Sequence, residues 1–184
     1  NARLCLTNLK AASVKFASLP DQNFSGGCHT IDTIKLLDFG TPTTNLGAMT
    51  CPLAANFAAW AQHAVVPAAR VYFGSEVVKI ETMGTYSCRN VNGASSGKLS
   101  EHAFGNAVDV SGFVLANGRR ITITDGWNGA SDERAFLRRL RESACKRFGT
   151  VLSPDYNAAH YNHLHFDMGQ TMKNGSSFRK SSTS

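Results

Sequence analysis

The chain has 184 residues, of which 42% are hydrophobic and 17% are charged. This length suits one domain with a sizeable core, and the composition excludes a disordered chain or a fibrous repeat. No apolar run approaches the roughly 18 residues needed to cross a bilayer, so we expect no membrane span. The formal net charge of +6 favours anionic partners, among them nucleic acid, anionic lipid and a carboxylate-rich cell wall.

Apolar periodicity and turn residues predict a series of elements along the chain. In chain order they are helix 2–18, strand 34–39, helix 53–73, strand 77–82, strand 107–115, strand 120–124, helix 131–148 and strand 163–167. Pro20 should stop the first helix, Pro67 should kink or divide the second, and Gly74 should end it. Asn117-Gly118 is a strong hairpin signal between two strands, and Ser131 should cap the last helix.

This order of helices and hairpin-linked strands favours a single α+β domain with a central, mainly antiparallel sheet flanked by helices. The globular domain is expected to span residues 1–168. Residues 169–184 are polar and are expected to form a flexible tail. No motif sets an oligomeric state, and a monomer is the working expectation.

Five cysteines are scattered along the chain, and none forms a close CxxC pair that would favour a structural zinc finger. Two disulfides with one spare thiol is the preferred interpretation, and five reduced core cysteines is the alternative. The expected pairs are Cys5 with Cys28, which are close in sequence, and Cys88 with Cys145. Disulfides would place the chain in the periplasm or outside the cell, with a signal peptide already removed.

The segment His-Leu-His-Phe-Asp at residues 163–167 alternates polar and apolar side chains. Side chains two apart on a strand share a face. His163, His165 and Asp167 should therefore point one way, while Leu164 and Phe166 pack into the core. Three ionisable groups on one face of a buried strand are costly unless a ligand or metal engages them.

A second polar group precedes it, in the segment Ser-Glu-His-Ala-Phe-Gly-Asn-Ala-Val-Asp at residues 100–109. Gly105 permits a tight turn between His102 and the strand that carries Asp109. Together with His165, these residues offer two imidazole nitrogens and one carboxylate oxygen, a typical three-ligand set for one catalytic zinc ion. The mixed ligands favour zinc, with manganese and cobalt as alternatives.

Segment 100–109 followed by His163-Leu164-His165 resembles the zinc signature of a metallopeptidase superfamily. That superfamily includes D-Ala-D-Ala dipeptidases, lysostaphin-type endopeptidases and the hedgehog signalling domain. The spacing of His160, His163 and His165 is most similar to that of penicillin-insensitive murein endopeptidases. The segments that resemble the bacterial extensin-like C-terminal domain family are 51–54, 86–90, 99–109, 148–152 and 154–160.

The resemblance implies a hedgehog- and DD-peptidase-like fold and a zinc-dependent peptidase that hydrolyses amide bonds in peptidoglycan stem peptides or crosslinks. It implies that His102, Asp109 and His165 are the zinc ligands. His163 would be the general base or the stabiliser of the developing oxyanion, and His160 a second polar residue at the cleft. The bond that is cut (D,D, L,D or terminal) is left open.

One departure concerns the base. The dipeptidase branch places a glutamate just before its last ligand, whereas this chain has Asn162 and His163 there. Catalysis by histidine, as in the endopeptidase branches, is the better match. Arg89 is expected to hold a substrate carboxylate, with an ordinary surface arginine as the alternative. Ser100 is placed with it at the substrate site, as a brace for the ligand loop rather than a nucleophile.

Two other functions compete with a peptidase. A catalytically silent zinc-binding module could recognise cell-wall peptide or a protein partner. A metal-dependent nuclease would use the positive charge and the histidines, but the chain lacks the aromatic-plus-basic stretches that hold nucleic acid. We therefore expect no nucleic-acid partner.

Overall fold

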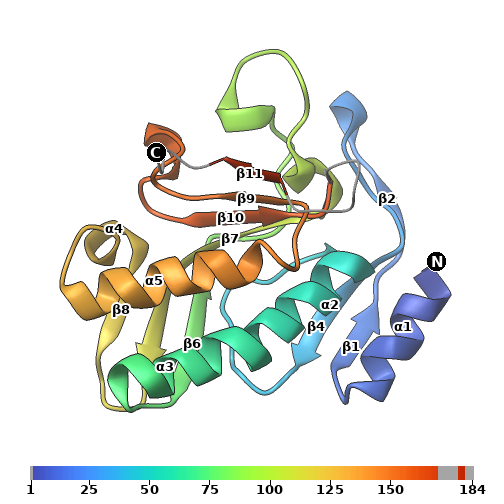
Figure 1. Ribbon diagram of the computed structural model, residues 1–184. Coiled ribbons are helices and arrows are strands. Elements are labelled where there is room, and N and C mark those ends of the chain that lie inside the picture. The colour runs from blue at the N-terminus through green and yellow to red at the C-terminus, as the bar shows by residue number, and fades with distance from the viewer. Residues whose placement is uncertain (1, 170–177, 181–184) are drawn as a thin grey trace.

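The computed structural model describes residues 2–169 and 178–180, which form one α+β domain (Figure 1). The helices are α1 (Ala2–Ala11), α2 (Cys51–Trp60), α3 (Val66–Phe73), α4 (Ile123–Gly126) and α5 (Ser131–Ala144), with a π-helical turn, η2 (Ala61–Val65), between α2 and α3. Short 3-10 helices are η1 (Ser25–Gly27), η3 (Val91–Gly93), η4 (Glu101–Phe104) and η5 (Ala158–His160).

The strands belong to three sheets, and the largest of these carries the candidate site. Its strands, in spatial order, are β11 (Phe178–Lys180), β9 (Thr150–Leu152), β10 (Leu164–Asp167), β7 (Ala107–Leu115) and β6 (Val77–Thr82), and β8 (Arg120–Thr122) also pairs with β7. The pairing is antiparallel apart from β11 with β9. The smaller sheets contain β1 (Lys15–Ser18), β4 (Thr33–Asp38) and β5 (Met49–Thr50), and the hairpin of β2 (Gln22–Asn23) and β3 (His29–Thr30). The predicted single α+β domain with a mainly antiparallel sheet and several helices is confirmed.

The main core lies between the large sheet and a layer of helices, in which α2 and α3 follow one another end to end through η2 and α5 runs alongside them (Figure 1). Trp60 of α2 is fully buried, and its ring packs edge-on against Phe166 of β10 with ring centroids 4.9 Å apart. Phe113 of β7 packs in the same way against Phe136 of α5, at 5.4 Å. These buried aromatic contacts fix one face of β7 and β10 and leave the opposite face for polar side chains.

Several helices and strands begin or end at residues other than those predicted. The first helix ends at Ala11 rather than at residue 18, because Ser13 adopts a positive φ of 60° and β1 then pairs with β4. The strand predicted over 120–124 ends at Thr122, whose hydroxyl caps α4. Helix α5 ends at Ala144 rather than at residue 148, and Ser131 is its first residue rather than its cap.

Two other boundary signals hold, whereas Pro20 does not stop the first helix, since β1 lies between them. Gly74 adopts a left-handed conformation, with φ 61°, and ends α3 as predicted. Pro67 lies in the first turn of α3, where its missing N–H costs least, and the π-helical turn before it divides the predicted helix. Of the predicted tail, residues 178–180 form β11, whereas 170–177 and 181–184 lie outside the described residues.

Two disulfides are present, as predicted, but both predicted pairings were wrong. Cys5 of α1 bonds to Cys51 at the start of α2, and Cys28 bonds to Cys88. Cys145 is buried and lies outside both disulfides. Closeness in sequence misled the prediction, because each bridge joins segments that come together only when the helices and hairpins pack. Across residues 2–169 and 178–180, the helices are too short or too polar to span a bilayer.

Candidate metal centre

Two of the predicted ligands face each other on neighbouring strands. His165 of β10 lies directly opposite Asp109 of β7 in the antiparallel register. Their neighbours Val108 and Phe166 are fully buried in the core on the other face. The predicted alternation is therefore confirmed, and it brings residues 56 positions apart in the sequence into contact.

The third predicted ligand, His102, is held by a short helix just before β7. The Ser100 hydroxyl accepts a hydrogen bond from the His102 backbone N–H at 3.2 Å, so Ser100 braces the ligand loop as expected. Gly105 ends the helix with φ 65°, and a β-carbon there would lie only 3.0 Å from the Ala48 carbonyl oxygen. Glycine is required at this turn both for its left-handed backbone and for the close approach.

The three side chains are buried and converge on one point. His102 Nε2 lies 3.0 Å from Asp109 Oδ2, and His165 Nδ1 lies 3.0 Å from Asp109 Oδ1. One ligand atom from each residue falls within 4.8 Å of the others. Two imidazoles and a carboxylate in this arrangement can hold one metal ion.

The contacts of His102 indicate whether a cation fits between its ring and Asp109. Its Nδ1 lies 3.1 Å from the carbonyl oxygen of Thr85, which can only accept, so Nδ1 carries the proton. The buried Nε2 makes no hydrogen bond to any described residue, although Asp109 Oδ2 lies 3.0 Å away. Two acceptors that face each other in a buried site repel unless a positive charge lies between them. A metal ion fits this position.

His165 is held between two carboxylates. Its Nε2 lies 2.7 Å from Asp167 Oδ2, and its Nδ1 faces Asp109. Burial alone lowers the pKa of His165, but hydrogen bonds to Asp109 and Asp167 outweigh it and raise the pKa to about 9. The site therefore stabilises positive charge in the absence of a metal. If His165 held a metal, the hydrogen bond to Asp167 would orient its ring, as such partners do for ligating histidines.

Asp109 is a carboxylate at the centre of the cluster. Burial on its own raises the pKa of Asp109, but close contacts with the imidazoles of His102 and His165, together with their charge, hold it well below its usual range. Asp109 is therefore ionised at neutral pH. A buried carboxylate with imidazole partners on both oxygens is poised to coordinate a cation.

His163 and His160 line the same site from the connection between β9 and β10. His163 Nε2 lies 3.7 Å from Asp109 Oδ1, and its Nδ1 contacts Asn162 Oδ1 at 2.8 Å. His160 Nδ1 contacts Asn157 Oδ1 at 2.6 Å. Burial lowers the pKa of both rings, to about 4 for His160, so both are neutral at pH 7.

These contacts set the tautomers of the two rings. Each Nδ1–H donates to an asparagine oxygen, which leaves each Nε2 with a lone pair. The Nε2 of His163 faces the metal centre, where it can accept a proton. Sequence reasoning did not single out Asn157 or assign Asn162 a role. Their positions beside the two histidines were the only available signal.

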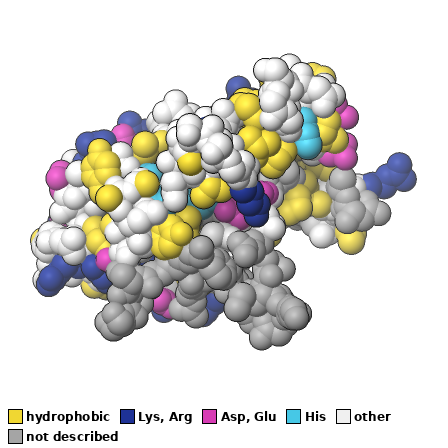
Figure 2. Space-filling view, turned by 90° about the horizontal axis from the view of Figure 1, so that it is seen from above, with side chains coloured by type: hydrophobic (Ala, Val, Ile, Leu, Met, Phe, Trp, Pro, Cys, Tyr) yellow, Lys and Arg dark blue, Asp and Glu magenta, His cyan; other side chains and the backbone are white. Residues whose placement is uncertain are grey.

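The candidate metal centre forms the floor of a cleft with one cationic and one aromatic wall. Arg89 is half-buried, and its Nη2 lies 3.5 Å from Asp109 Oδ2. The structure thus brings Arg89 to the site, as predicted. The cleft lining that sequence reasoning missed includes Lys98, Leu99, Leu152 and Tyr156. Figure 2 shows histidine side chains reaching this face close to a group of acidic and basic side chains.

Comparison with known proteins gives one family match, which covers nearly the whole domain. The family described as extensin-like protein C-terminus matches residues 3–178. No curated protein matched the chain, and no solved structure matched it. The matched range includes every residue of the metal cluster and both walls of the cleft. The chain therefore belongs to the extensin-like protein C-terminus family.

Proposed function

We propose that this protein is a zinc-dependent hydrolase that cleaves amide bonds in peptidoglycan stem peptides or crosslinks. The observation that carries the proposal is the buried cluster of His102, Asp109 and His165 beside the unprotonated Nε2 of His163. Two nitrogen ligands and one oxygen ligand suit zinc and leave room for further ligands. A bound zinc ion would supply Lewis acidity and would lower the pKa of water.

The side chains around the cluster suit amide hydrolysis. His163 is neutral and its Nε2 is oriented into the site, so it can accept a proton from water and return it to the departing amine. Asn162 fixes that tautomer through Nδ1. Arg89 reaches Asp109 from the cleft wall and can bind a substrate carboxylate or a developing oxyanion.

The substrate class rests on charge and on resemblance. Stem peptides are rich in carboxylates, which suit the cationic wall of Arg89 and Lys98. The signature shared with murein endopeptidases, including the spacing of His160, His163 and His165, points to the same substrates. Two disulfides support export to the periplasm or the cell exterior, where peptidoglycan lies.

The test is digestion of purified muropeptides by the zinc-reconstituted protein, followed by mass spectrometry of the fragments. We expect new amine and carboxyl ends that disappear when a chelator removes zinc. His165→Ala should lose both zinc and cleavage. His63→Ala, a change at an exposed histidine on the π-helical turn, should keep both.

Unchanged fragments from every muropeptide, with zinc shown to be bound, would contradict the proposal. Retention on cell-wall sacculi without cleavage would then favour the alternative function, a zinc-binding module that recognises the wall.

A further inference from the structure

The segment between β9 and β10, residues 153–163, forms the aromatic wall of the cleft. It carries Tyr156, His160 and His163 to the site. The Tyr156 ring packs edge-on against His160 at 5.6 Å between centroids, and His160 contacts His163 at 4.9 Å. These three rings form a row that ends beside Asp109. What holds this segment in place therefore decides the shape of the cleft.

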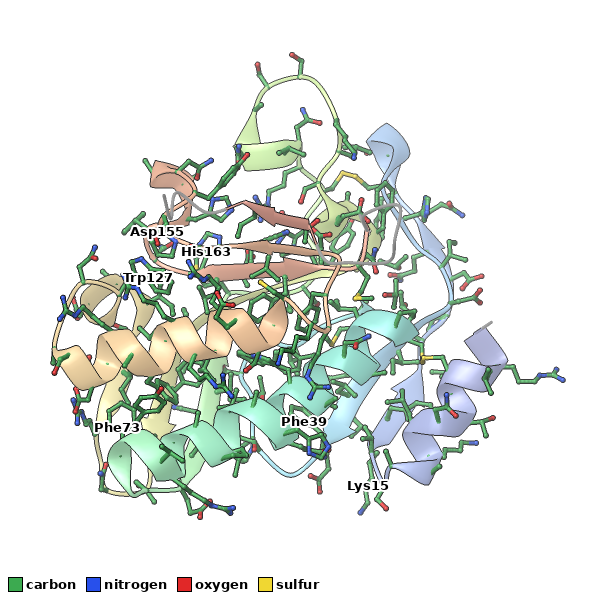
Figure 3. All side chains as sticks on the ribbon, viewed as in Figure 1. Lys15, Phe39, Phe73, Trp127, Asp155 and His163 are labelled. Atoms are coloured by element: carbon green, nitrogen blue, oxygen red, sulfur yellow. A yellow bond between two sulfur atoms is a disulfide. The ribbon has the colours of Figure 1, made fainter. Side chains whose placement is uncertain are left out.

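Asp155 connects the far side of this segment to the helical layer. Its Oδ1 accepts a hydrogen bond from Trp127 Nε1 at 2.9 Å, and its Oδ2 lies 3.5 Å from Arg141 Nη1. Its backbone N–H is bonded to the Ser153 hydroxyl at 3.3 Å. Figure 3 shows Trp127, Asp155 and His163 grouped together above α5. Asp155 thus links the cleft wall to residues that do not line the cleft.

The partners of Asp155 are themselves held firmly. Trp127 is only 2% exposed, and the Arg138 guanidinium lies over its ring, 4.2 Å from the centroid. Arg138 also donates to the Trp127 carbonyl oxygen. Arg141 is buried on α5, where its Nη2 also pairs with Glu142 Oε1 at 3.4 Å. The anchor is therefore rigid on the helical side.

We propose that Asp155 is a positioning residue that holds the segment 153–163 against Trp127 and Arg141, so that Tyr156 and His160 form the substrate-facing wall beside the metal centre. This inference rests on the proposed function for its effect on substrate. The metal ligands come from β7, β10 and η4, so the anchor acts on the wall and leaves the ligands in place.

The test compares Asp155→Asn with a matched control. Asp132→Asn removes a carboxylate that also pairs with an arginine, Arg119, at 3.0 Å, but on the exposed start of α5. Hydrogen exchange of the zinc-loaded proteins should show faster exchange confined to residues 153–163 in Asp155→Asn and no change there in Asp132→Asn. Zinc affinity should match the wild type in both variants.

Kinetics on muropeptides should show whether Asp155→Asn displaces the cleft wall or unfolds the protein. Misplacement of a substrate wall weakens ground-state binding, so we expect Asp155→Asn to raise KM about tenfold. We expect kcat to change less than about threefold, because His163 directly precedes β10 and is held by that strand. Trp127→Phe keeps an aromatic side chain but removes the Nε1–H donor. If Trp127 acts through Asp155, the double variant should be no worse than Asp155→Asn alone.

Unchanged exchange of residues 153–163 in Asp155→Asn would overturn the inference, and so would fully additive effects of the two substitutions. A wild-type protein that cleaves no muropeptide would contradict the proposed function instead. The exchange experiment would still decide whether Asp155 fixes the segment, because that measurement does not depend on turnover.

Discussion

The metal ligands and the cleft walls are held in different ways. Asp109 and His165 lie on paired strands whose other faces are packed against buried aromatic side chains. The walls are loops: one contains Arg89 and is tied down by a disulfide at Cys88, and the other is held by the side chain of Asp155. The sheet thus places two of the three candidate ligands, and the loops line the cleft above them.

This difference predicts that substitutions in the sheet should affect metal binding, whereas substitutions in the walls should affect substrate and stability. The largest effect is expected at Asp109, because both imidazole ligands contact its carboxylate. Asp109→Asn keeps the shape but removes the charge that balances the cation. We expect zinc affinity to fall by more than about 100-fold, beyond the loss typical of residues that only orient a ligand. Competition with a chromophoric chelator measures it.

A zinc affinity for Asp109→Asn within a few-fold of the wild type would show that this cluster is not the metal site. Circular dichroism of the metal-free variant serves as the control for folding.

His163 lies where the cleft wall meets the candidate metal ligands, and it is not itself one of the ligands. A substitution there should therefore separate metal binding from catalysis. His163→Ala should retain zinc, because its Nε2 is 3.7 Å from Asp109 and all three ligands remain. Loss of a general acid–base should lower kcat by about 10²–10⁴-fold. Steady-state kinetics on muropeptides, with zinc content measured in parallel, checks both. Full turnover by this variant would remove His163 from the mechanism.

Asp167 contacts the candidate metal centre through a hydrogen bond to His165 Nε2. Asp167→Asn weakens the contact to His165 Nε2 that orients the ring. We expect zinc affinity to fall by about 10–100-fold, less than for a direct ligand. The variant Asp155→Asn is the control, because it removes a carboxylate from the cleft wall and should leave zinc affinity unchanged. Equal affinities of wild type and Asp167→Asn would show that Asp167 has no part in the site.

The candidate ligand set could be predicted from sequence because each residue lies in a recognisable local pattern and the resemblance to a zinc signature joins the two segments, 100–109 and 163–165. Strand alternation places Asp109 and His165 on one face, and the requirement for glycine at Gly105 follows from the turn beside His102. The strand β9 was missed because three residues carry too little periodicity. The start of the chain was assigned to one long helix because a positive φ at Ser13 has no reliable sequence signal.

The supports of the cleft could not be predicted, because they depend on contacts between segments far apart in the chain. The Cys28–Cys88 bridge spans 60 residues, and the bond from Trp127 to Asp155 spans 28. Neither pair has a local pattern that selects one partner over another. Such contacts follow from the packing of the whole domain, which a single sequence does not reveal.

The two disulfides offer a matched test of the walls. Chain entropy predicts a similar cost for losing either bridge, about 4 kcal/mol, because the closed loops are similar in length. The pair Cys28 and Cys88 holds the loop that carries Arg89, whereas Cys5 and Cys51 join α1 to α2. We expect both double serine variants to lose comparable stability in urea.

Only the Cys28/Cys88 variant should also lose substrate binding, by about tenfold in KM, because its cationic wall is released. The KM values are compared at a temperature where both variants remain folded. Equal KM values for the two double variants would show that the bridge beside Arg89 has no role in shaping the cleft.

The smallest expected effect is on the pH dependence of stability, through the protonation of His160 in the aromatic wall. Burial lowers the pKa of His160 to about 4, from about 6.5 in an unfolded chain. Between these values the unfolded chain binds a proton that the folded protein does not. His160 therefore costs no stability at pH 7, but it destabilises the fold as the pH falls from about 6.5 towards 4.

His160→Gln removes this proton uptake while keeping a side chain that can hydrogen-bond to Asn157. Metal-free wild type should lose about 2–3 kcal/mol more stability than the variant between pH 7 and pH 4.5. Urea unfolding at a series of pH values measures the difference. Parallel pH profiles would mean that His160 is solvated and able to accept a proton in the folded protein. The wall would then be open to water at His160, contrary to the burial of this ring in the structure.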